Sequence, residues 1–327
     1  MLLIVGAHFY RSADYIRAAR ELGLGLSVGT DAAARWTHSD AVDVRAVDFT
    51  HFDGAVRDLT AFATDRGVTS VLGVDEVTVE LAAGVAAELG VKSNPLSALR
   101  RTHRKDAFRD ALRGCEYSVS SFRAFGLNES VLPTELFDQY PCVAKPTAMS
   151  ASRGVIRVDE ASALGPVLER LRALVARERS YFEQRILVEP FVDGPEFALE
   201  GMLTTGRLNV LALFDKPDVS EGPYFAESIY VTPSQLPHVR QRACAACVEA
   251  AAAKLGLVDG PVHAELRWSK QGPVLLEMAA RGIGGLCGRI FSMARPYSLE
   301  EVHIRQAVGL PPPTLPSEVP AAGVLML

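Results

Sequence analysis

The hydrophobic pattern of the chain changes near residue 93, and the two patterns require different architectures. Residues 1–92 alternate short apolar runs with helical patterns. The strand-like runs are residues 2–5, 24–28 and 68–74, and the helical segments are residues 12–22, 52–65 and 77–89. Strand–helix alternation is typical of a parallel sheet covered by helices. The sequence therefore predicts an N-terminal α/β domain over residues 1–92.

The second pattern, over residues 93–310, is a series of strands joined by glycine-containing turns, with few helices between them. It begins with an arginine-rich helical segment at residues 96–112. The strand-like runs are residues 141–145, 154–158, 186–192, 196–203, 208–214, 261–268 and 273–278, and the later helices are residues 161–177 and 236–255. Hairpin-ordered strands with packed helices predict an α+β domain. A proline-rich linker and a short apolar strand-like run follow at residues 311–327.

Charge and composition exclude several classes of function. The net charge is −5, so no basic field recruits nucleic acid or an anionic membrane. The five cysteines are odd in number and scattered, which favours a reducing cytoplasm over a disulfide framework. No apolar run approaches the roughly 18 residues of a membrane span, and the apolar start is too short for a signal peptide. We expect a cytoplasmic protein with small-molecule partners, and the sequence leaves a homo-oligomer open.

The most informative stretch is a lysine that closes an apolar strand and precedes a polar loop. Lys145 ends the run 142–145, and the loop that follows contains Ser150, Ser152, Arg153 and Gly154. Small residues let backbone N–H groups approach an anion, and serine and arginine add donors. Two strands joined by such a loop would form a flap over phosphates. A plain hairpin with a polar tip and a snorkelling lysine explains the same letters.

A second stretch runs from Glu189 to Glu196 and contains a proline within a strand. Pro190 removes a ladder donor, which predicts a sheet edge or a break. Backbone groups beside Phe191 and Val192 would then be free to pair with a purine edge, and Glu196 could accept hydrogen bonds from a ribose. A surface hairpin is the alternative interpretation.

Two carboxylates flank the turn at residues 269–272. A hairpin on this turn places Glu265 opposite, or nearly opposite, Glu277 on adjacent strands. Like charges in this arrangement destabilise a sheet, so a positive group should offset them. A hard divalent cation held by carboxylates and phosphate oxygens fits, which predicts Mg²⁺, with Mn²⁺ as a substitute. Neutralisation by Arg267 or Arg281 is the alternative.

An arginine and a glycine-rich turn follow the second carboxylate directly. Arg281 precedes Gly282, Gly284 and Gly285. A guanidinium beside exposed backbone N–H groups suits a phosphate or a substrate carboxylate.

Taken together, these motifs resemble the ATP-grasp superfamily of carboxylate–amine ligases, over roughly residues 94–310. The resemblance implies two subdomains that sandwich ATP, with a flap subdomain at about residues 118–190. It implies that Lys105 and Lys145 bind ATP, and that Ser150, Ser152, Arg153 and Gly154 form the mobile phosphate loop. The implied remaining nucleotide contacts are Glu189, Phe191 and Val192 at the adenine hinge and Glu196 at the ribose. Glu265 and Glu277 are the implied metal ligands, and Arg281 and Lys145 the implied catalytic residues.

The sequence is most similar to the L-amino-acid ligase, or dipeptide synthetase, branch. Many superfamily members carry a metal-binding asparagine two residues after the second metal carboxylate, where this chain has Ala279. Its loss is common in this branch and puts full occupancy of a second metal site in doubt. The branch also carries a C-terminal module, so residues 311–327 are expected to be a linker and the start of a shortened or missing module.

The resemblance implies that a carboxylate is activated as an acyl phosphate and joined to an amine. The expected carboxylate is an amino acid or a peptide-like acid. ADP and phosphate would be released. Lys216, Glu227, Gly284 and Gly285 fall in segments that approach the substrates in the superfamily. Two alternatives remain open: an enzyme acting on a nucleotide-precursor amine, and a catalytically inactive nucleotide-binding subunit.

Overall fold

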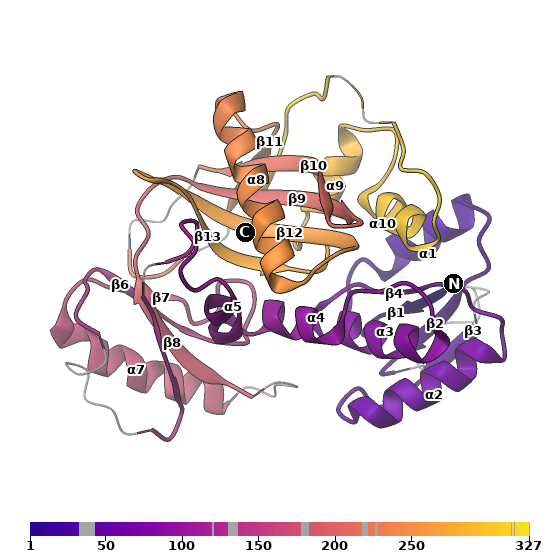
Figure 1. Ribbon diagram of the computed structural model, residues 1–327, viewed down its shortest axis with the longest axis horizontal. Helices are drawn as coiled ribbons and strands as arrows, with labels where there is room; N and C mark the ends of the chain where they lie inside the picture. Colours follow the sequence, from indigo (N-terminus) through magenta and orange to yellow (C-terminus); the bar gives the residue numbers. More distant parts are fainter. Residues whose placement is uncertain are drawn as a thin grey trace.

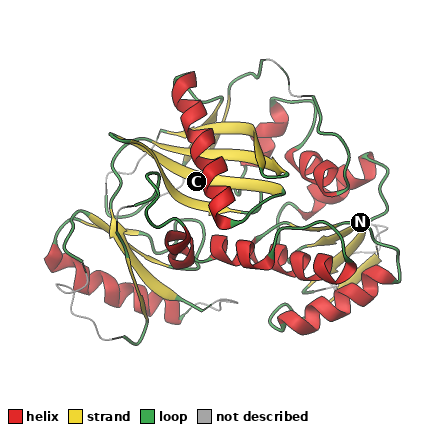
Figure 2. Ribbon diagram, viewed as in Figure 1, coloured by secondary structure: helices red, strands yellow, loops and turns green. Residues whose placement is uncertain are grey.

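The chain folds into three β-sheets that are joined by helices (Figures 1 and 2). The computed structural model describes residues 1–32, 43–119, 121–129, 137–177, 183–217, 222–225, 228–314, 316 and 318–326. Within these residues, no helix has both the length and the apolar character needed to cross a membrane. The architecture confirms the expected α/β region followed by an α+β region.

The first sheet is parallel and has the strand order β3-β2-β1-β4. Its strands are β1 (Leu2–Ile4), β2 (Ser27–Thr30), β3 (Asp43–Ala46) and β4 (Val71–Gly73), and its helices are α1 (Ser12–Glu21), α2 (Phe52–Thr64) and α3 (Glu76–Leu89). The sequence pattern missed β3, which is a mostly exposed edge strand and therefore lacks an apolar run. The loops that leave the carboxyl ends of β1 and β4 carry side chains into the candidate site described below.

The second sheet, here called the flap sheet, is antiparallel and has the order β5-β8-β6-β7. Its elements are β5 (Arg123–Gly126), β6 (Cys142–Pro146), β7 (Ile156–Val158), β8 (Arg185–Pro190) and helix α7 (Ala161–Ala176). The helix buries Leu164, Leu168 and Leu171, which recur with helical spacing, in one core with the strands. Pro190 ends β8 beyond its pairing with β5, so the missing N–H costs no ladder bond there.

The third sheet is antiparallel and has the order β13-β12-β9-β10-β11-β14. Its strands are β9 (Glu196–Thr204), β10 (Arg207–Lys216), β11 (Ile229–Thr232), β12 (Gly260–Ser269), β13 (Gly272–Ala279) and β14 (Ala322–Leu325). The helices that pack with it are α8 (His238–Leu255), α9 (Cys287–Met293) and α10 (Leu299–Ala307). The strand-like run near the end of the chain thus becomes β14, which pairs with β11 at the sheet edge.

The arginine-rich segment at residues 96–112 is two helices, and the prediction of one continuous helix was wrong. Helix α4 (Leu96–His103) and helix α5 (Lys105–Ala111) are separated by Arg104, whose extended backbone has φ −105° and ψ 115°. The break frees the backbone N–H of Lys105, which donates to the carbonyl oxygen of Thr147 at 2.8 Å. The two helices lie between the parallel sheet and the flap sheet (Figure 1). The break therefore fixes Lys105 against the flap sheet.

Candidate active site

A cavity of about 380 Å³ is lined by residues of the flap sheet and the third sheet and by the segments that follow β1 and β4. Most of the residues singled out from the sequence meet in it. They are Lys105, Lys145, Ser150, Ser152, Glu189, Phe191, Val192, Glu196, Glu265, Glu277, Arg281, Gly284 and Gly285. Arg153 and Gly154 lie outside its lining, Lys216 borders it through ion pairs, and Glu227 lies outside the described residues.

Lys145 belongs to a buried group of two cations and one carboxylate. Its Nζ lies 2.6 Å from Oε1 of Glu189, on the neighbouring strand β8. Arg109 of α5 bonds to both oxygens of the same carboxylate, at 2.6 Å and 3.0 Å. Burial alone would raise the pKa of Glu189, but Arg109 and Lys145 outweigh it and lower that pKa to about 2. Burial lowers the pKa of Lys145, a shift that Glu189 opposes and that Arg109 and Lys105 reinforce.

Arg109 was not predicted from the sequence as a site residue, and Glu189 was predicted to lie at the adenine hinge. Arg109 is 1% exposed and also donates to the carbonyl oxygens of Leu275 and Leu276 on β13, both at 2.9 Å. An arginine in an arginine-rich helical segment carries no sequence signal of burial. The carboxylate of Glu189 is committed to Arg109 and Lys145 in this structure.

The two carboxylates of the β12–β13 hairpin lie directly opposite each other. The strand register pairs Glu265 with Glu277, and a β-bulge follows Glu265. Two lysines offset the charges: Lys105 Nζ lies 3.0 Å from Oε2 of Glu277, and Lys216 Nζ lies 3.2 Å from Oε1 of Glu265. Arg267 and Arg281, the alternative partners, form their ion pairs with Glu196 and Glu76, and the charge of Glu277 also acts on Arg281.

The donor set fits a magnesium ion that shares its coordination with a phosphate. Glu265 and Glu277 line the same cavity, and the described residues contain no group of three or more metal-ligating side chains. Mg²⁺ is usually held by one or two carboxylates together with substrate phosphates and water. Position 279, where a third oxygen ligand would be expected, is a buried alanine on β13.

The loop after β6 has the backbone of an anion-binding turn. Ala151, Ser152 and Gly154 have φ of 56°, 52° and 75°, in the left-handed region. Such turns aim successive N–H groups at one side of the loop. Lys105 Nζ donates to the carbonyl oxygen of Met149 at 2.8 Å, so this lysine connects α5 to the loop. Ser150 and Ser152 face the cavity, while Gly154 packs against Pro146.

The segment after β8 forms an aromatic wall of the cavity. The Phe191 ring stacks on Phe225 at 6.3 Å, and the Arg267 guanidinium lies 4.8 Å from the centre of the Phe191 ring. The backbone N–H of Phe191 donates to Pro141 and the carbonyl of Val192 accepts from Arg267. These two groups are occupied, so the predicted contact with a purine edge stays a prediction for the carbonyl of Phe191 and the N–H of Val192.

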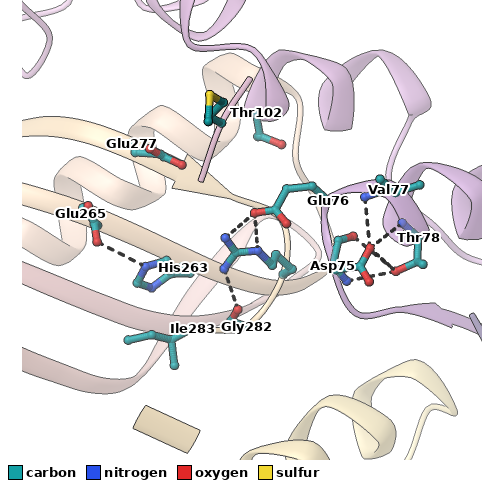
Figure 3. A network of polar contacts seen from close by, with 12 residues as sticks. Asp75, Glu76, Val77, Thr78, Thr102, His263, Glu265, Glu277, Gly282 and Ile283 are labelled. Atoms are coloured by element: carbon teal, nitrogen blue, oxygen red, sulfur yellow. Dashed lines mark hydrogen bonds and ion pairs between the residues drawn. The ribbon is translucent and has the colours of Figure 1, made fainter. Parts of the chain in front are cut away.

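Glu76 is a cavity residue that the sequence analysis missed. It begins α3, just after the carboxyl end of β4, and its Oε1 accepts from Nε of Arg281 at 2.8 Å (Figure 3). The pKa of Glu76 is lowered to about 2, because the Arg281 guanidinium outweighs the opposing effect of burial. The preceding Asp75 caps α3 by accepting from the N–H groups of Val77 and Thr78. Ligands of parallel sheets bind at the carboxyl ends of strands, a rule that could have pointed to Glu76.

A buried glutamate behind the cavity connects the hairpin to the glycine turn, here defined as residues 282–285. Glu200 on β9 is fully buried and accepts from the backbone N–H of Ile283 at 2.9 Å. His263 Nδ1 lies 3.7 Å from Glu200, and its Nε2 lies 3.9 Å from Glu265 (Figure 3). Burial opposes protonation, but Glu200 and Glu265 raise the pKa of His263 to about 9. The His263 ring therefore lies between the two carboxylates.

Part of the chain matches a known protein family. Residues 138–290, which contain the flap loop, Glu265, Glu277 and Arg281, match the family described as ATP-grasp domain. Over these residues the chain is similar to an ATP-grasp domain. The match leaves out Lys105 and the parallel sheet, which precede residue 138.

The individual proteins to which this chain is similar are distant in sequence. Alanine–anticapsin ligase of Bacillus subtilis is 23% identical over 248 residues, covering 70% of this chain and 52% of that protein. Dapdiamide A synthase of Enterobacter agglomerans is 27% identical over 169 residues, covering 50% of this chain and 36% of that protein. This chain spans at most 61% of the length of the curated relatives compared.

Solved structures show the same fold. The crystal structure of an L-amino acid ligase from Bacillus licheniformis superposes with a TM-score of 0.82 at 24% sequence identity. The superposition covers all of this chain and 80% of that one. The match extends the shared ATP-grasp fold over the parallel sheet as well as the two antiparallel sheets.

The buried group around Glu189 predicts a specific pH dependence. A carboxylate whose folded pKa, about 2, lies below its ordinary 4.5 stabilises the fold above pH 4.5 and loses that contribution as pH falls toward 2. In Glu189→Gln this contribution is absent. The stability advantage of wild type over Glu189→Gln should therefore shrink by roughly 3 kcal/mol between pH 5 and 2.

Urea denaturation across this pH range measures the difference, with exposed Glu169→Gln on α7 as the matched control. The control should follow the wild-type pH profile. Parallel profiles for wild type and Glu189→Gln would contradict the assignment of Glu189 as a buried, ionised carboxylate.

Proposed function

We propose that this chain is an ATP-dependent carboxylate–amine ligase. It activates a carboxylate as an acyl phosphate, joins it to an amine as an amide, and releases ADP and phosphate. One observation carries the proposal: two lysines, Lys105 and Lys145, and two facing carboxylates, Glu265 and Glu277, line one cavity with Arg281.

In this proposal the nucleotide lies along the cavity with its base near Phe191 and its phosphates toward the glycine turn. The aromatic wall offers a flat apolar surface, and Glu196 lies beside it as an acceptor for ribose hydroxyls. Lys105, Lys145 and the loop with Ser150 supply cationic and neutral donors for the phosphates. These donors are positioned before the nucleotide arrives, which lowers the ordering cost of binding.

Glu265 and Glu277 are the residues that would hold Mg²⁺ (or Mn²⁺) in this proposal. The ion would neutralise charge on the β- and γ-phosphates. Lys105 and Lys216, which offset the carboxylates in this structure, keep the pair from repelling each other without the ion.

The chemistry proceeds in two displacements. A carboxylate oxygen attacks the γ-phosphorus, the bond to the β–γ bridging oxygen breaks, and ADP leaves. The amine nitrogen then attacks the acyl carbon, the C–O bond to phosphate breaks, and the amine loses a proton. Arg281 and the N–H groups of the glycine turn stabilise the charge that develops on the transferred group. Arg281 changes partner from Glu76 to this group, which keeps the buried guanidinium paired throughout.

An amino acid or peptide-like acid is the proposed acyl donor. The named activities of alanine–anticapsin ligase and L-amino acid ligase support this class. Gly284 and Gly285 line the cavity beside Arg281, and Lys216 borders it, so these residues are the proposed substrate contacts. In this division of the chain, residues 1–92 cover the substrate end and residues 93–310 bind the nucleotide. Strand β14 pairs with β11, so it belongs to the third sheet and not to the separate C-terminal module expected from the sequence.

The first test of the proposal concerns the nucleotide site. Lys145→Met keeps the length of the side chain and removes its charge. A desolvated cation–phosphate contact contributes about 1.5–3 kcal/mol, so the dissociation constant for ATP should rise about 10- to 100-fold. Isothermal titration measures it, and exposed Lys270→Met in the β12–β13 turn is the control. Equal ATP affinity in Lys145→Met and Lys270→Met would remove Lys145 from the nucleotide site.

The second test concerns the reaction. Wild-type protein is incubated with ATP, Mg²⁺ and pairs from an amino-acid panel, and phosphorus NMR follows the nucleotide. The proposal predicts ADP and phosphate in amounts that depend on two amino acids, and a product with the mass of their amide. AMP and pyrophosphate would contradict the acyl phosphate. ATP consumption that needs only a nucleotide-precursor amine would favour the alternative substrate, and no consumption would favour an inactive subunit.

A further inference from the structure

The glycine-turn end of the cavity has an apolar wall built from distant parts of the chain. Phe9 and Tyr10 come from the loop after β1, Ile283 from the glycine turn, and Met326 from the residue after β14. On the same cavity lie the ionised groups of Glu76 and Arg281. The lining at this end therefore offers apolar surface next to a charged pair, and the nucleotide proposed above leaves this end to the other reactants.

The edge strand β14 determines where Met326 points. Its register pairs Tyr230 with Val324 and Ile229 with Leu325, and the N–H of Met326 extends the ladder by donating to Ser228 at 2.7 Å. Side chains alternate along a strand. Val324 and Met326 accordingly pack against the hydrophobic core that the third sheet shares with α9 and α10. The side chain between them, Leu325, is 57% exposed.

Met326 lies directly on the glycine turn. A Cβ added at Gly285 would be 2.5 Å from Cε and 2.8 Å from Sδ of Met326, so a side chain there would displace the end of Met326. Gly285 also has φ 59°, in the left-handed region that favours glycine. On the other side of the turn, the Tyr10 hydroxyl donates to the carbonyl oxygen of Gly285 at 2.9 Å. The turn is thus held between the loop after β1 and Met326.

We propose that Met326 is a specificity-determining residue: with Phe9 and Tyr10 it forms an apolar subsite that takes the hydrocarbon side chain of a substrate bound beside Glu76 and Arg281. The inference rests on the proposed ligase function and adds the chemical class of this substrate, an amino acid with an apolar side chain. An unbranched thioether adapts its shape to different apolar groups. The subsite therefore selects by size and apolar character.

The test compares Met326→Ala, Met326→Gln and the control Leu325→Ala, which truncates the neighbouring side chain on the outer face of β14. Each protein is assayed for ADP formation with glycine, alanine, valine, leucine and phenylalanine, first varied as the acid with a fixed amine and then as the amine with a fixed acid. One methylene changes discrimination about 10-fold or more in a fitted apolar pocket. In one of the two series, Met326→Ala should shift the kcat/KM ratio of phenylalanine to alanine about 10-fold toward phenylalanine.

The near-isosteric Met326→Gln keeps the volume and adds polarity. It should lower kcat/KM for leucine and phenylalanine about 10-fold while the KM for ATP stays at the wild-type value. Leu325→Ala should keep the wild-type preference in both series. Which series shifts identifies whether the acid or the amine occupies the subsite.

Three results would overturn the subsite. Turnover with wild-type preferences in both Met326 variants overturns it and leaves the ligase function standing. An equal shift in Leu325→Ala, or a parallel rise in the KM for ATP, shows a general effect on structure and also overturns it. If wild type consumes no ATP with any pair, the proposed function fails, and the subsite fails with it.

Discussion

Every lysine and arginine that lines the cavity is paired with a carboxylate in the absence of nucleotide. Lys145 and Arg267 pair with carboxylates on neighbouring strands. Lys105 of α5 pairs with Glu277 of β13. Arg281 pairs with Glu76 at the start of α3. An unpaired buried charge costs several kcal/mol, so these cations require partners whether or not a ligand is present. Under the proposed function, phosphate oxygens would replace or join the protein carboxylates as partners of these cations.

The same ion pairs hold the three sheets around the cavity. Arg109 of α5 joins the flap sheet through Glu189 and the large sheet through the carbonyls of β13. The loop after β1 joins the parallel sheet to the glycine turn, because Arg11 donates to the carbonyl of Ile283 at 2.7 Å and pairs with Glu300. Contacts that position the substrate end are therefore contacts between distant segments.

The residues that the sequence could predict are those with a local anomaly. Lys145 at the end of an apolar strand, and Glu265 and Glu277 around one turn, are unusual where they stand, and the hairpin fixes their register. The parallel sheet was predictable from its period, except for β3, which is exposed and lacks that signal. The break at Arg104 could not be predicted, because the sequence on both sides of it has helical character. The hydrogen bond from Lys105 to Thr147 that accompanies the break is a tertiary contact.

Residues that depend on long-range contacts escaped prediction. Arg109, Glu76 and Met326 are ordinary letters in their own segments, and each acquires its role from a partner far away in the sequence. Glu76 and Arg281 are 205 residues apart, and the Gly285–Tyr10 bond spans 275 residues. No periodicity or spacing encodes such pairs. Only the β4 strand end, where parallel sheets bind ligands, gave a general reason to examine Glu76.

The central claim is that a carboxylate oxygen attacks the γ-phosphorus, and isotope transfer tests that bond directly. The acid substrate is prepared with ¹⁸O in both carboxylate oxygens, and the phosphate released during turnover is analysed by mass spectrometry. Formation and aminolysis of an acyl phosphate move one carboxylate oxygen to phosphate, so the account predicts one ¹⁸O in each released phosphate and one in the amide. Unlabelled phosphate, with the label retained in the acid or found in AMP, would contradict it.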